Sequence, residues 1–392
     1  MDSQPYELEF QSHQRFPILF CGDSPSSLVQ EICSIIGARR AILCTTPTVA
    51  REYADIIEET GQRLGSNLRV MVLPLCEAGK NIDAALGICA EAQRFGIGRR
   101  DVLIALGGGV CSDIVRVAAA LIRRGVPHIC VPTTLIGQID AGVGIKGAVN
   151  FNGSKSYLGV FHRPEATLIW PQFLTTLDAA AWRDGLAEAI KLACIASVRL
   201  FRLIDSVADL LDHGLTRRPS LAVAEMVRRC IQVTIDELAL DPTEQGNLER
   251  LLDFGHSFSP LIESVSGHAI SHGRAVAIDM SYSAALSNSM GTLSDDDYDC
   301  IIAAVTRCGL PIDCPELDPE LIERAIESAV KHRNGHLNLV LPVAIGQCVF
   351  LKAPDMLSRA MIDKALARLR MEQPVSPVSS DRPAPRSANH LC

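Results

Sequence analysis

Short apolar runs alternate with helix-like segments along the first half of the chain. Each run has the length of a strand buried on both faces, and the segments between them repeat apolar residues at helical spacing. The predicted strands are 41–44, 68–73, 102–106 and 129–131, and the predicted helices are 50–60, 82–95 and 112–123. Such alternation is typical of parallel βαβ units. We therefore expect an α/β domain over residues 16–177, preceded by an N-terminal extension over 1–15.

Longer amphipathic segments dominate from about residue 178 onward. Apolar positions recur there with the period of a helix, and the predicted helices are 185–204, 221–238, 256–265, 273–287 and 319–331. This half should be mainly helical and form a second domain over residues 178–372. The segment 373–392 is rich in Pro and Ser and has too little apolar content to pack, so we expect a disordered tail.

Composition and charge narrow the class of protein. Hydrophobic residues make up 48% and charged residues 21% of the 392, which is ordinary for a globular enzyme. The net charge of −8 argues against nucleic acid or an anionic membrane as the main partner. No stretch approaches the roughly 18 uninterrupted apolar residues of a spanning helix, and the first residues lack a signal sequence, so we expect a cytoplasmic protein. The 14 cysteines form no CxxC pair and are interpreted as small buried hydrophobes.

Three residues of the helical half carry side chains suited to a catalytic metal. Glu188 lies in Gly-Leu-Ala-Glu-Ala-Ile-Lys, His256 in Asp-Phe-Gly-His and His272 in Ser-His-Gly. One carboxylate oxygen and two imidazole nitrogens suit zinc, cobalt accepts the same set, and three protein ligands leave a position open for substrate. The alternative is that each histidine is a hydrogen-bonded core or cap residue, because ligands so scattered match no short zinc motif.

A predicted strand runs directly into a glycine-rich turn. Gly107, Gly108, Gly109 and Val110 follow the strand, and Asp113 opens the next predicted helix. Glycines allow backbone amides to approach a pyrophosphate, and the helix N-terminus adds a favourable dipole. The turn is not GxGxxG, so a simple tight turn and an ordinary N-cap role for Asp113 remain alternatives.

Basic residues follow the glycine turn. Arg124, Lys146 and Lys155 lie near Asp140 in the sequence, and the lysines stand among Gly, Val and Asn residues. Together they suit a phosphate, since Lys offers a compact charge and Arg a bidentate fork. A solvated basic surface is the alternative interpretation.

These motifs occur in one order along the chain. Gly-Gly-Gly-Val is followed by Arg-Gly, Val-Pro-Thr-Thr-Leu, Lys-x-x-x-Gly, Gly-Leu-Ala-Glu-x-Ile-Lys, Gly-His-Ser-Phe and His-Gly-x-Ala-Val-Ala. The series resembles the sugar phosphate cyclases, the family of dehydroquinate synthase, over roughly residues 15–370. The resemblance implies an N-terminal Rossmann-like NAD-binding domain, a C-terminal helical metal-binding domain, an active site between them and a homodimer.

The resemblance also implies roles for individual residues. Glu188, His256 and His272 would bind the metal. Lys146, Lys191 and Arg124, the last from the neighbouring subunit, would hold substrate, and Asp140, Asp253 and Lys155 complete the expected catalytic set. The residues expected to contact NAD are Glu77, Lys80, Gly107, Gly108, Gly109, Val110, Asp113, Thr133, Thr134, Ile136, Asp140, Lys155 and Thr176. Thr45 stands where the family often places an acid on the adenosine ribose.

Departures from dehydroquinate synthase bear on the substrate. Glu249 stands where a carboxylate-binding Arg is expected, Asp253 replaces Asn and Pro260 replaces a second His. A carboxylate facing Glu249 and Asp253 would be repelled, whereas a hydroxymethyl group would donate hydrogen bonds to Asp253. Arg250 adjoins the missing Arg, and a register shift there would restore a basic contact. Ser156 and the pair 332–333 also depart from the family pattern.

Asp-Phe-Gly-His-x-Phe-Ser-Pro, with Asn-Phe-Asn-Gly at 150–153 and Ile-Asp-Met at 278–280, is similar to the 2-epi-5-epi-valiolone synthase branch of the family. The resemblance implies sedoheptulose 7-phosphate as substrate. It also implies a redox-neutral sequence of transient oxidation by NAD, β-elimination of phosphate, reduction, ring opening and aldol closure. The alternatives are dehydroquinate synthase, another sedoheptulose 7-phosphate cyclase, a metal-dependent NAD alcohol dehydrogenase and a non-catalytic binding protein.

Overall fold

The computed structural model describes residues 14–212, 219–244, 249–267, 269–332 and 335–371. The tail predicted over 373–392 and most of the N-terminal extension lie outside the described residues. No helix in the described part is both long and apolar enough to cross a membrane.

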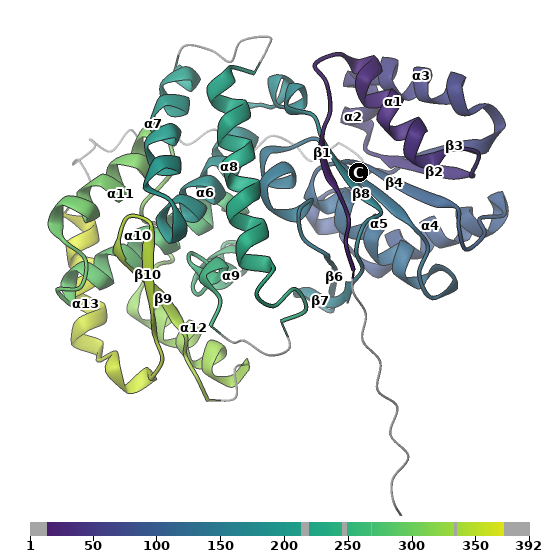
Figure 1. Ribbon diagram of the computed structural model, residues 1–392. Helices are drawn as coiled ribbons and strands as arrows, with labels where there is room; N and C mark the ends of the chain where they lie inside the picture. Colours follow the sequence, from purple (N-terminus) through teal and green to yellow (C-terminus); the bar gives the residue numbers. More distant parts are fainter. Residues whose placement is uncertain (1–13, 213–218, 245–248, 268, 333–334, 372–392) are drawn as a thin grey trace, which may run out of the picture.

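Six parallel strands form the sheet of the first half, in the order β1-β8-β5-β4-β2-β3 (Figure 1). Their bounds are β1 Ile18–Phe20, β2 Ala41–Thr45, β3 Leu68–Val72, β4 Val102–Gly107, β5 His128–Pro132 and β8 Ala166–Ile169. The four strands predicted from the sequence are β2 to β5, because these are predominantly apolar runs. The sequence analysis missed β1 and β8, which are only three and four residues long.

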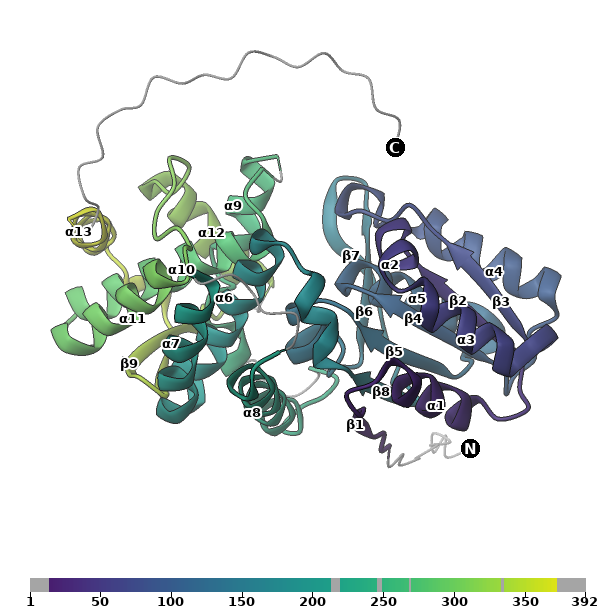
Figure 2. The same ribbon diagram turned by 90° about the horizontal axis from the view of Figure 1, so that it is seen from above.

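Helices cover both faces of this sheet, as Figure 2 shows from above. One face packs against α1 (Pro25–Ile36) and α3 (Ala54–Leu64), and the other against α4 (Ile82–Phe95) and α5 (Gly109–Leu121). The helix predicted over 50–60 is divided into α2 (Pro47–Glu52) and α3. The break falls at Tyr53, whose φ of −127° and ψ of 37° are not helical, and whose hydroxyl is bonded to Thr176.

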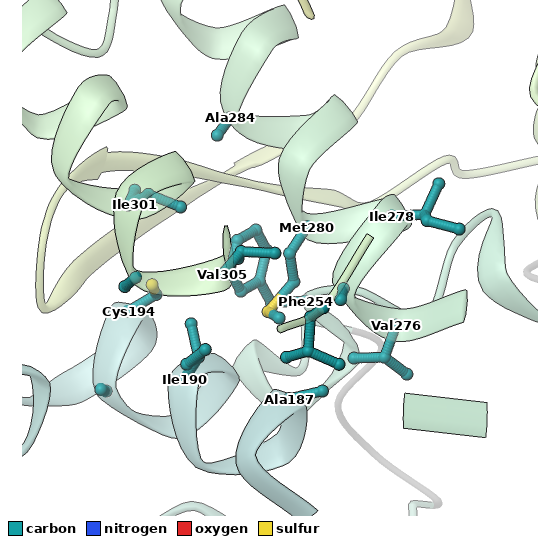
Figure 3. Packing of buried hydrophobic residues seen from close by; sticks show 14 of the residues in the cluster. Ala187, Ile190, Cys194, Phe254, Val276, Ile278, Met280, Ala284, Ile301 and Val305 are labelled. Atoms are coloured by element: carbon teal, nitrogen blue, oxygen red, sulfur yellow. The ribbon is translucent and has the colours of Figure 1, made fainter. Parts of the chain in front are cut away.

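Helices make up most of the described part of the second half, which also contains a β-hairpin. Their bounds are α6 Ala179–Ala196, α7 Val198–Asp212, α8 Leu221–Leu238, α9 Ser259–Val265, α10 His272–Ser289, α11 Asp295–Arg307, α12 Pro319–His332 and α13 Arg359–Arg370, with the hairpin β9 Leu339–Ala344 and β10 Gln347–Leu351. The single helix predicted over 185–204 is two helices, because Ser197 is extended (φ −155°, ψ 99°). Ala187, Ile190, Met280 and Val305 pack together in the core of this half (Figure 3).

The two halves contact each other directly. Gly185 on α6 lies directly against Leu135, which follows β5; a Cβ at position 185 would lie 2.4 Å from that of Leu135. Arg228 on α8 stacks over the Phe20 ring of β1, 3.8 Å from its centroid. A second hairpin, β6 (Lys146–Phe151) and β7 (Ser154–Phe161), extends from the first half toward α9 and α12. The predicted fold class, a Rossmann-like domain joined to a helical one, is confirmed; the residue boundaries of the domains stay predictions.

Candidate active site

Glu188, His256 and His272 lie together between α6, the turn before α9 and the start of α10. The Glu188 Oε1 atom is 3.1 Å from His272 Nε2 and 3.6 Å from His256 Nε2. One ligand atom from each residue lies within 4.8 Å of the other two. The Glu188 side chain is fully buried, while the imidazoles are about a third exposed. The three predicted metal ligands therefore converge on one point that is open on the histidine side.

The outer nitrogens of both imidazoles are already bonded. His256 Nδ1 donates to the Phe254 carbonyl oxygen at 3.2 Å, and His272 Nδ1 donates to the Glu263 carboxylate at 3.0 Å. In each ring Nε2 therefore faces Glu188, and once it has lost its proton it can bind a cation, which is the usual arrangement around metal-bound histidines. Glu263 was missed by the sequence analysis. Its signal was an acid within the apolar turn Leu-Ile-Glu of α9.

The charged groups of this cluster strongly shift one another's pKa. Burial works to raise the pKa of Glu188, but the Lys191 ammonium at 2.6 Å and the two imidazoles hold that pKa well below its usual range. Burial opposes protonation of both histidines. His256, next to Lys191, has a pKa lowered to about 4 by burial and that ammonium. For His272, bonds to Glu188 and Glu263 outweigh burial and raise the pKa to about 9.

Close packing fixes the position of the helices that carry the ligands. A Cβ at Gly273, the second residue of α10, would lie 2.3 Å from the Asp184 Cα of α6, so only glycine allows this approach. Ser271 donates to the Asp184 carboxylate at 2.6 Å in the same place. The buried Asp279 carboxylate accepts from the backbone amides of Phe258 and Ser259 at 2.5 and 2.9 Å, which anchors the start of α9.

The glycine turn lies at the carboxyl end of β4. Gly107 ends the strand and α5 begins at Gly109, so backbone amides open toward the sheet edge. A Cβ on Gly108 would lie 3.0 Å from the Thr134 methyl group, and the two segments therefore form one narrow cradle. Lys80 and Asp113 form an ion pair of 2.6 Å beside the turn. This edge has the form of a dinucleotide-binding site in a parallel sheet.

The other residues expected near NAD differ in burial and in their hydrogen bonds. Thr133 is buried, and the Thr176 hydroxyl is bonded to Tyr53 at 2.6 Å. Glu77 accepts from the Asn150 amide at 3.3 Å, which joins the loop before α4 to β6. Val110, Ile136 and Asp140 are partly exposed near the glycine turn. Thr45, which stands where the family often places an acid on the adenosine ribose, ends β2 and is fully buried.

Two cavities meet at His256. The first, of about 760 Å³, is lined by Asp113, Asp140, Lys146, Lys191, Asp253 and His256 among others. The second, of about 930 Å³, lies between the tip of the β6–β7 hairpin and α9, and its lining includes Glu77, Lys155, His256 and Pro260. The structure therefore gathers most of the predicted substrate residues around the metal ligands.

Arg124 lies elsewhere. It follows α5 with a φ of 68° and lines a separate cavity of about 620 Å³ with other arginines, at the opposite edge of the sheet. Within one chain it therefore does not meet the substrate residues. This placement agrees with the expectation that it acts on a neighbouring subunit, and that expectation stays a prediction.

The segment before His256 differs from the expectation. Glu249 pairs with Lys352 at 2.5 Å and does not line the first cavity as described. Arg250 lines it instead, bonded to Glu244 at 2.5 Å and Asp253 at 3.2 Å. The idea that Glu249 faces the substrate is therefore wrong for this cavity, because its carboxylate pairs with Lys352 and the neighbouring Arg250 lines the cavity. The Arg250 charge is balanced by two carboxylates.

Lys146 and Ser156 also line the first cavity. Lys146 forms an ion pair with Glu244, and burial together with nearby Arg250 lowers its pKa to about 8. Ser156 has a φ of 51° and its amide donates to the Asn150 side chain at 2.8 Å, so this departure keeps the hairpin turn intact. The departure at 332–333 lies outside the described side chains.

Comparisons with known proteins agree with this geometry. Models of the 3-dehydroquinate synthase N-terminal and C-terminal domains match residues 70–184 and 185–332. A 2-epi-5-epi-valiolone synthase from Actinoplanes sp. strain SE50/110 is 37% identical over 84% of this chain and 85% of its own length. A 3-dehydroquinate synthase from Thermoanaerobacter sp. strain X514 is 32% identical over 85% of this chain and 92% of its own length.

A solved structure is similar over nearly the whole fold. ValA, the 2-epi-5-epi-valiolone synthase from Streptomyces hygroscopicus subsp. jinggangensis 5008 with NAD⁺ and Zn²⁺ bound, matches with a TM-score of 0.87 and 33% identity. The match covers 94% of this chain and 100% of that one. Together with the domain models, these relatives confirm the resemblance seen in the motifs. The chain belongs to the 3-dehydroquinate synthase family of sugar phosphate cyclases.

Proposed function

We propose that this protein is a 2-epi-5-epi-valiolone synthase, which converts sedoheptulose 7-phosphate to a cyclic C7 ketone and releases phosphate. It would thus be a carbon–oxygen lyase acting on a phosphate ester. One observation carries the proposal: Lys146, Lys191 and Asp253 share a cavity with the metal ligand His256. Two relatives named 2-epi-5-epi-valiolone synthase support it, one at 37% identity and one a solved structure with a TM-score of 0.87.

The residues present fit both cofactors. A buried carboxylate and two imidazole Nε2 atoms within 4.8 Å form a suitable donor set for zinc or cobalt, with Glu188, His256 and His272 as ligands. The Gly107–Gly109 turn has no side chains, so its backbone amides are accessible to the pyrophosphate of NAD. When bound, NAD accepts a hydride and returns it within one turnover, and the divalent ion polarises the reacting oxygen as a Lewis acid.

The chain's own residues would bind and orient the substrate. Lys146 and Lys155, on the two strands of one hairpin, would hold the phosphate and its charge as it departs. Lys191 lies 2.6 Å from Glu188 and presents its remaining N–H groups to substrate hydroxyls beside the metal site. Asp140, which lines the same cavity, would accept hydrogen bonds from ring hydroxyls.

Asp253 would select the polyol end of the substrate. Its carboxylate accepts hydrogen bonds from a hydroxymethyl group but repels a carboxylate. Arg250 does not cancel this preference, since its guanidinium is already engaged by Glu244 and Asp253. A neutral ketose therefore suits the cavity better than an acidic heptulosonate.

Arg124 would complete the site of a partner subunit in a homodimer. Within its own chain it lies at the opposite edge of the sheet from Lys146, beside Arg99 and Arg100. A cation there would contribute to phosphate binding only if a second copy brought it to the cavity.

The runner-up is 3-dehydroquinate synthase itself, favoured by a guanidinium that does line the cavity at Arg250. Incubation of the NAD- and zinc-loaded protein with each sugar phosphate, followed by measurement of released phosphate, separates the two. We expect turnover of sedoheptulose 7-phosphate and none of the acidic heptulosonate phosphate. Turnover of the acidic substrate alone would overturn the proposal.

A further inference from the structure

Glu263 connects the metal site to the other half of the molecule. One carboxylate oxygen accepts from His272 Nδ1 at 3.0 Å, and the other accepts from the Lys155 ammonium of β7. The Glu263 side chain is only 5% exposed, so its charge must be balanced by these two partners. The two carboxylate oxygens of Glu263 therefore bond to different halves of the chain.

Contacts between α9 and α10 fix the position of Glu263. It lies in α9, a helix of seven residues whose first amides bond to the buried Asp279 of α10. Because α10 also carries His272 at its start, the carboxylate and the imidazole are held by the same pair of helices. The short helix thus presents Glu263 to His272 in a defined orientation.

A neutral imidazole has two tautomers, and only one leaves Nε2 free to bind a cation. A carboxylate bonded to Nδ1 selects the tautomer with hydrogen on Nδ1 and raises the basicity of Nε2. His256 has only a backbone carbonyl in the equivalent place, at 3.2 Å. The two histidine ligands therefore have outer partners of different strength.

We propose that Glu263 is a positioning residue that orients His272 as a metal ligand and, through its second oxygen, ties Lys155 to the metal half of the site. The inference rests on the proposed metal centre. It does not depend on which sugar phosphate is the substrate. Glu263 is not one of the three converging ligands, so its effect should appear first in metal affinity.

Three variants separate the two bonds. In Glu263→Ala both are lost. In Glu263→Gln an amide oxygen can still accept from His272, but the ion pair to Lys155 is gone. In Lys155→Met the carboxylate keeps His272 and loses only its partner on β7. Glu58→Gln on α3 is a matched control, because it removes an exposed carboxylate far from the site in the sequence.

The readout is the zinc dissociation constant of purified, NAD-free protein, measured by competition with a chromophoric chelator. Removing such an outer contact weakens metal binding roughly 10- to 100-fold in other sites. We expect a loss in this range for Glu263→Ala, a smaller one for Glu263→Gln, and wild-type affinity for Lys155→Met and Glu58→Gln. Visible absorption of the cobalt-loaded proteins should shift in the same order, since it reports ligand geometry.

Three outcomes would overturn the inference. One is zinc affinity of folded Glu263→Ala within about twofold of wild type, well below the range seen for outer contacts. Another is a loss in Lys155→Met as large as in Glu263→Ala, which would assign the effect to the contact between the halves. If wild type itself does not bind zinc, the proposed metal centre fails as well. Circular dichroism checks folding, and Glu263→Gln keeps the test available if Glu263→Ala does not fold.

Discussion

The metal centre and the nucleotide edge of the sheet are built in opposite ways. At the metal centre, Glu188 pairs with both Lys191 and His272 and has no exposed surface. At the nucleotide edge, backbone amides at Gly107–Gly109 form the cradle, and Lys80 pairs with Asp113 beside it. A site made of buried side chains that bond to one another should lose its ligand when one of them is replaced. A site made of backbone amides should lose only part of its affinity when a nearby side chain is replaced.

The largest effect is expected for Glu188→Gln. The change removes a metal ligand and leaves the buried Lys191 ammonium without its partner at 2.6 Å. Breaking a buried ion pair on one side costs about 3–5 kcal/mol of stability. We expect zinc affinity to fall by more than roughly 100-fold, since even outer contacts contribute up to that much. Dialysis with metal analysis and thermal unfolding measure both; a variant that retains one zinc per chain would contradict the account.

Gly273→Ala tests the packing that carries His272. The added methyl group would lie 2.3 Å from the Asp184 Cα, so α10 must move away from α6. Overpacking of this kind costs about 1–3 kcal/mol, and we expect a matching loss in denaturant unfolding together with weaker zinc binding. Gly87→Ala in α4 is the control, because nothing lies within 4 Å of its added Cβ. It should stabilise the protein by about 0.5–1 kcal/mol.

Asp113→Asn should have a graded effect at the nucleotide edge. It removes the charge that pairs with Lys80, while the glycine cradle stays intact. Loss of one charge-assisted hydrogen bond is worth about 1.5 kcal/mol, or roughly tenfold in affinity. We expect the dissociation constant of NAD, measured by calorimetry, to rise by that factor with zinc binding unchanged. Complete loss of NAD binding would show that this edge depends on single side chains after all.

The pH dependence of turnover should reflect Lys146. Burial and the neighbouring Arg250 lower its pKa to about 8, so the ammonium is present below that pH and is lost above it. Since the charged form holds phosphate, kcat/KM should fall as pH rises through about 8. In Lys146→Arg, whatever its absolute rate, this basic limb should move upward, because a guanidinium stays protonated. An unchanged limb in that variant would assign the titration to another group.

The smallest effect is expected for Thr45→Val. The Thr45 hydroxyl is buried in the sheet without a hydrogen-bond partner among the described residues. Replacing it with a methyl group removes an unsatisfied polar atom, so stability should stay the same or rise by up to about 1 kcal/mol. NAD affinity should not change. A marked loss of NAD affinity would show that Thr45 contributes to the NAD site.

The sequence predicted the features that depend on residue type and missed those that depend on exact position. Glu188, His256 and His272 were identifiable because only a few residue types bind a divalent ion, and the helices that carry them have clear apolar periods. Glu249 was misplaced, since Arg250 lines the cavity while Glu249 pairs with Lys352. No local pattern reveals which of two neighbouring side chains enters a cavity.

Contacts distant in sequence were equally hidden. Glu263 bonds to Lys155, 108 residues away, and no periodicity indicates that pair. The short strands β1 and β8 also carried no signal, because three or four residues are too few to show a repeat. Motif order, by contrast, identified the family, and most of the motifs contribute residues to the same site.

The central claim is that the metal centre and the nucleotide edge together perform a redox-neutral cyclisation. The most direct measurement follows one reaction of the zinc- and NAD-loaded protein with sedoheptulose 7-phosphate, by phosphate release, NADH absorbance and NMR of the product. The account predicts one phosphate per substrate, a cyclic C7 ketone and no net NADH. Stoichiometric accumulation of NADH, or an open-chain product that keeps its phosphate, would contradict it and indicate a dehydrogenase instead.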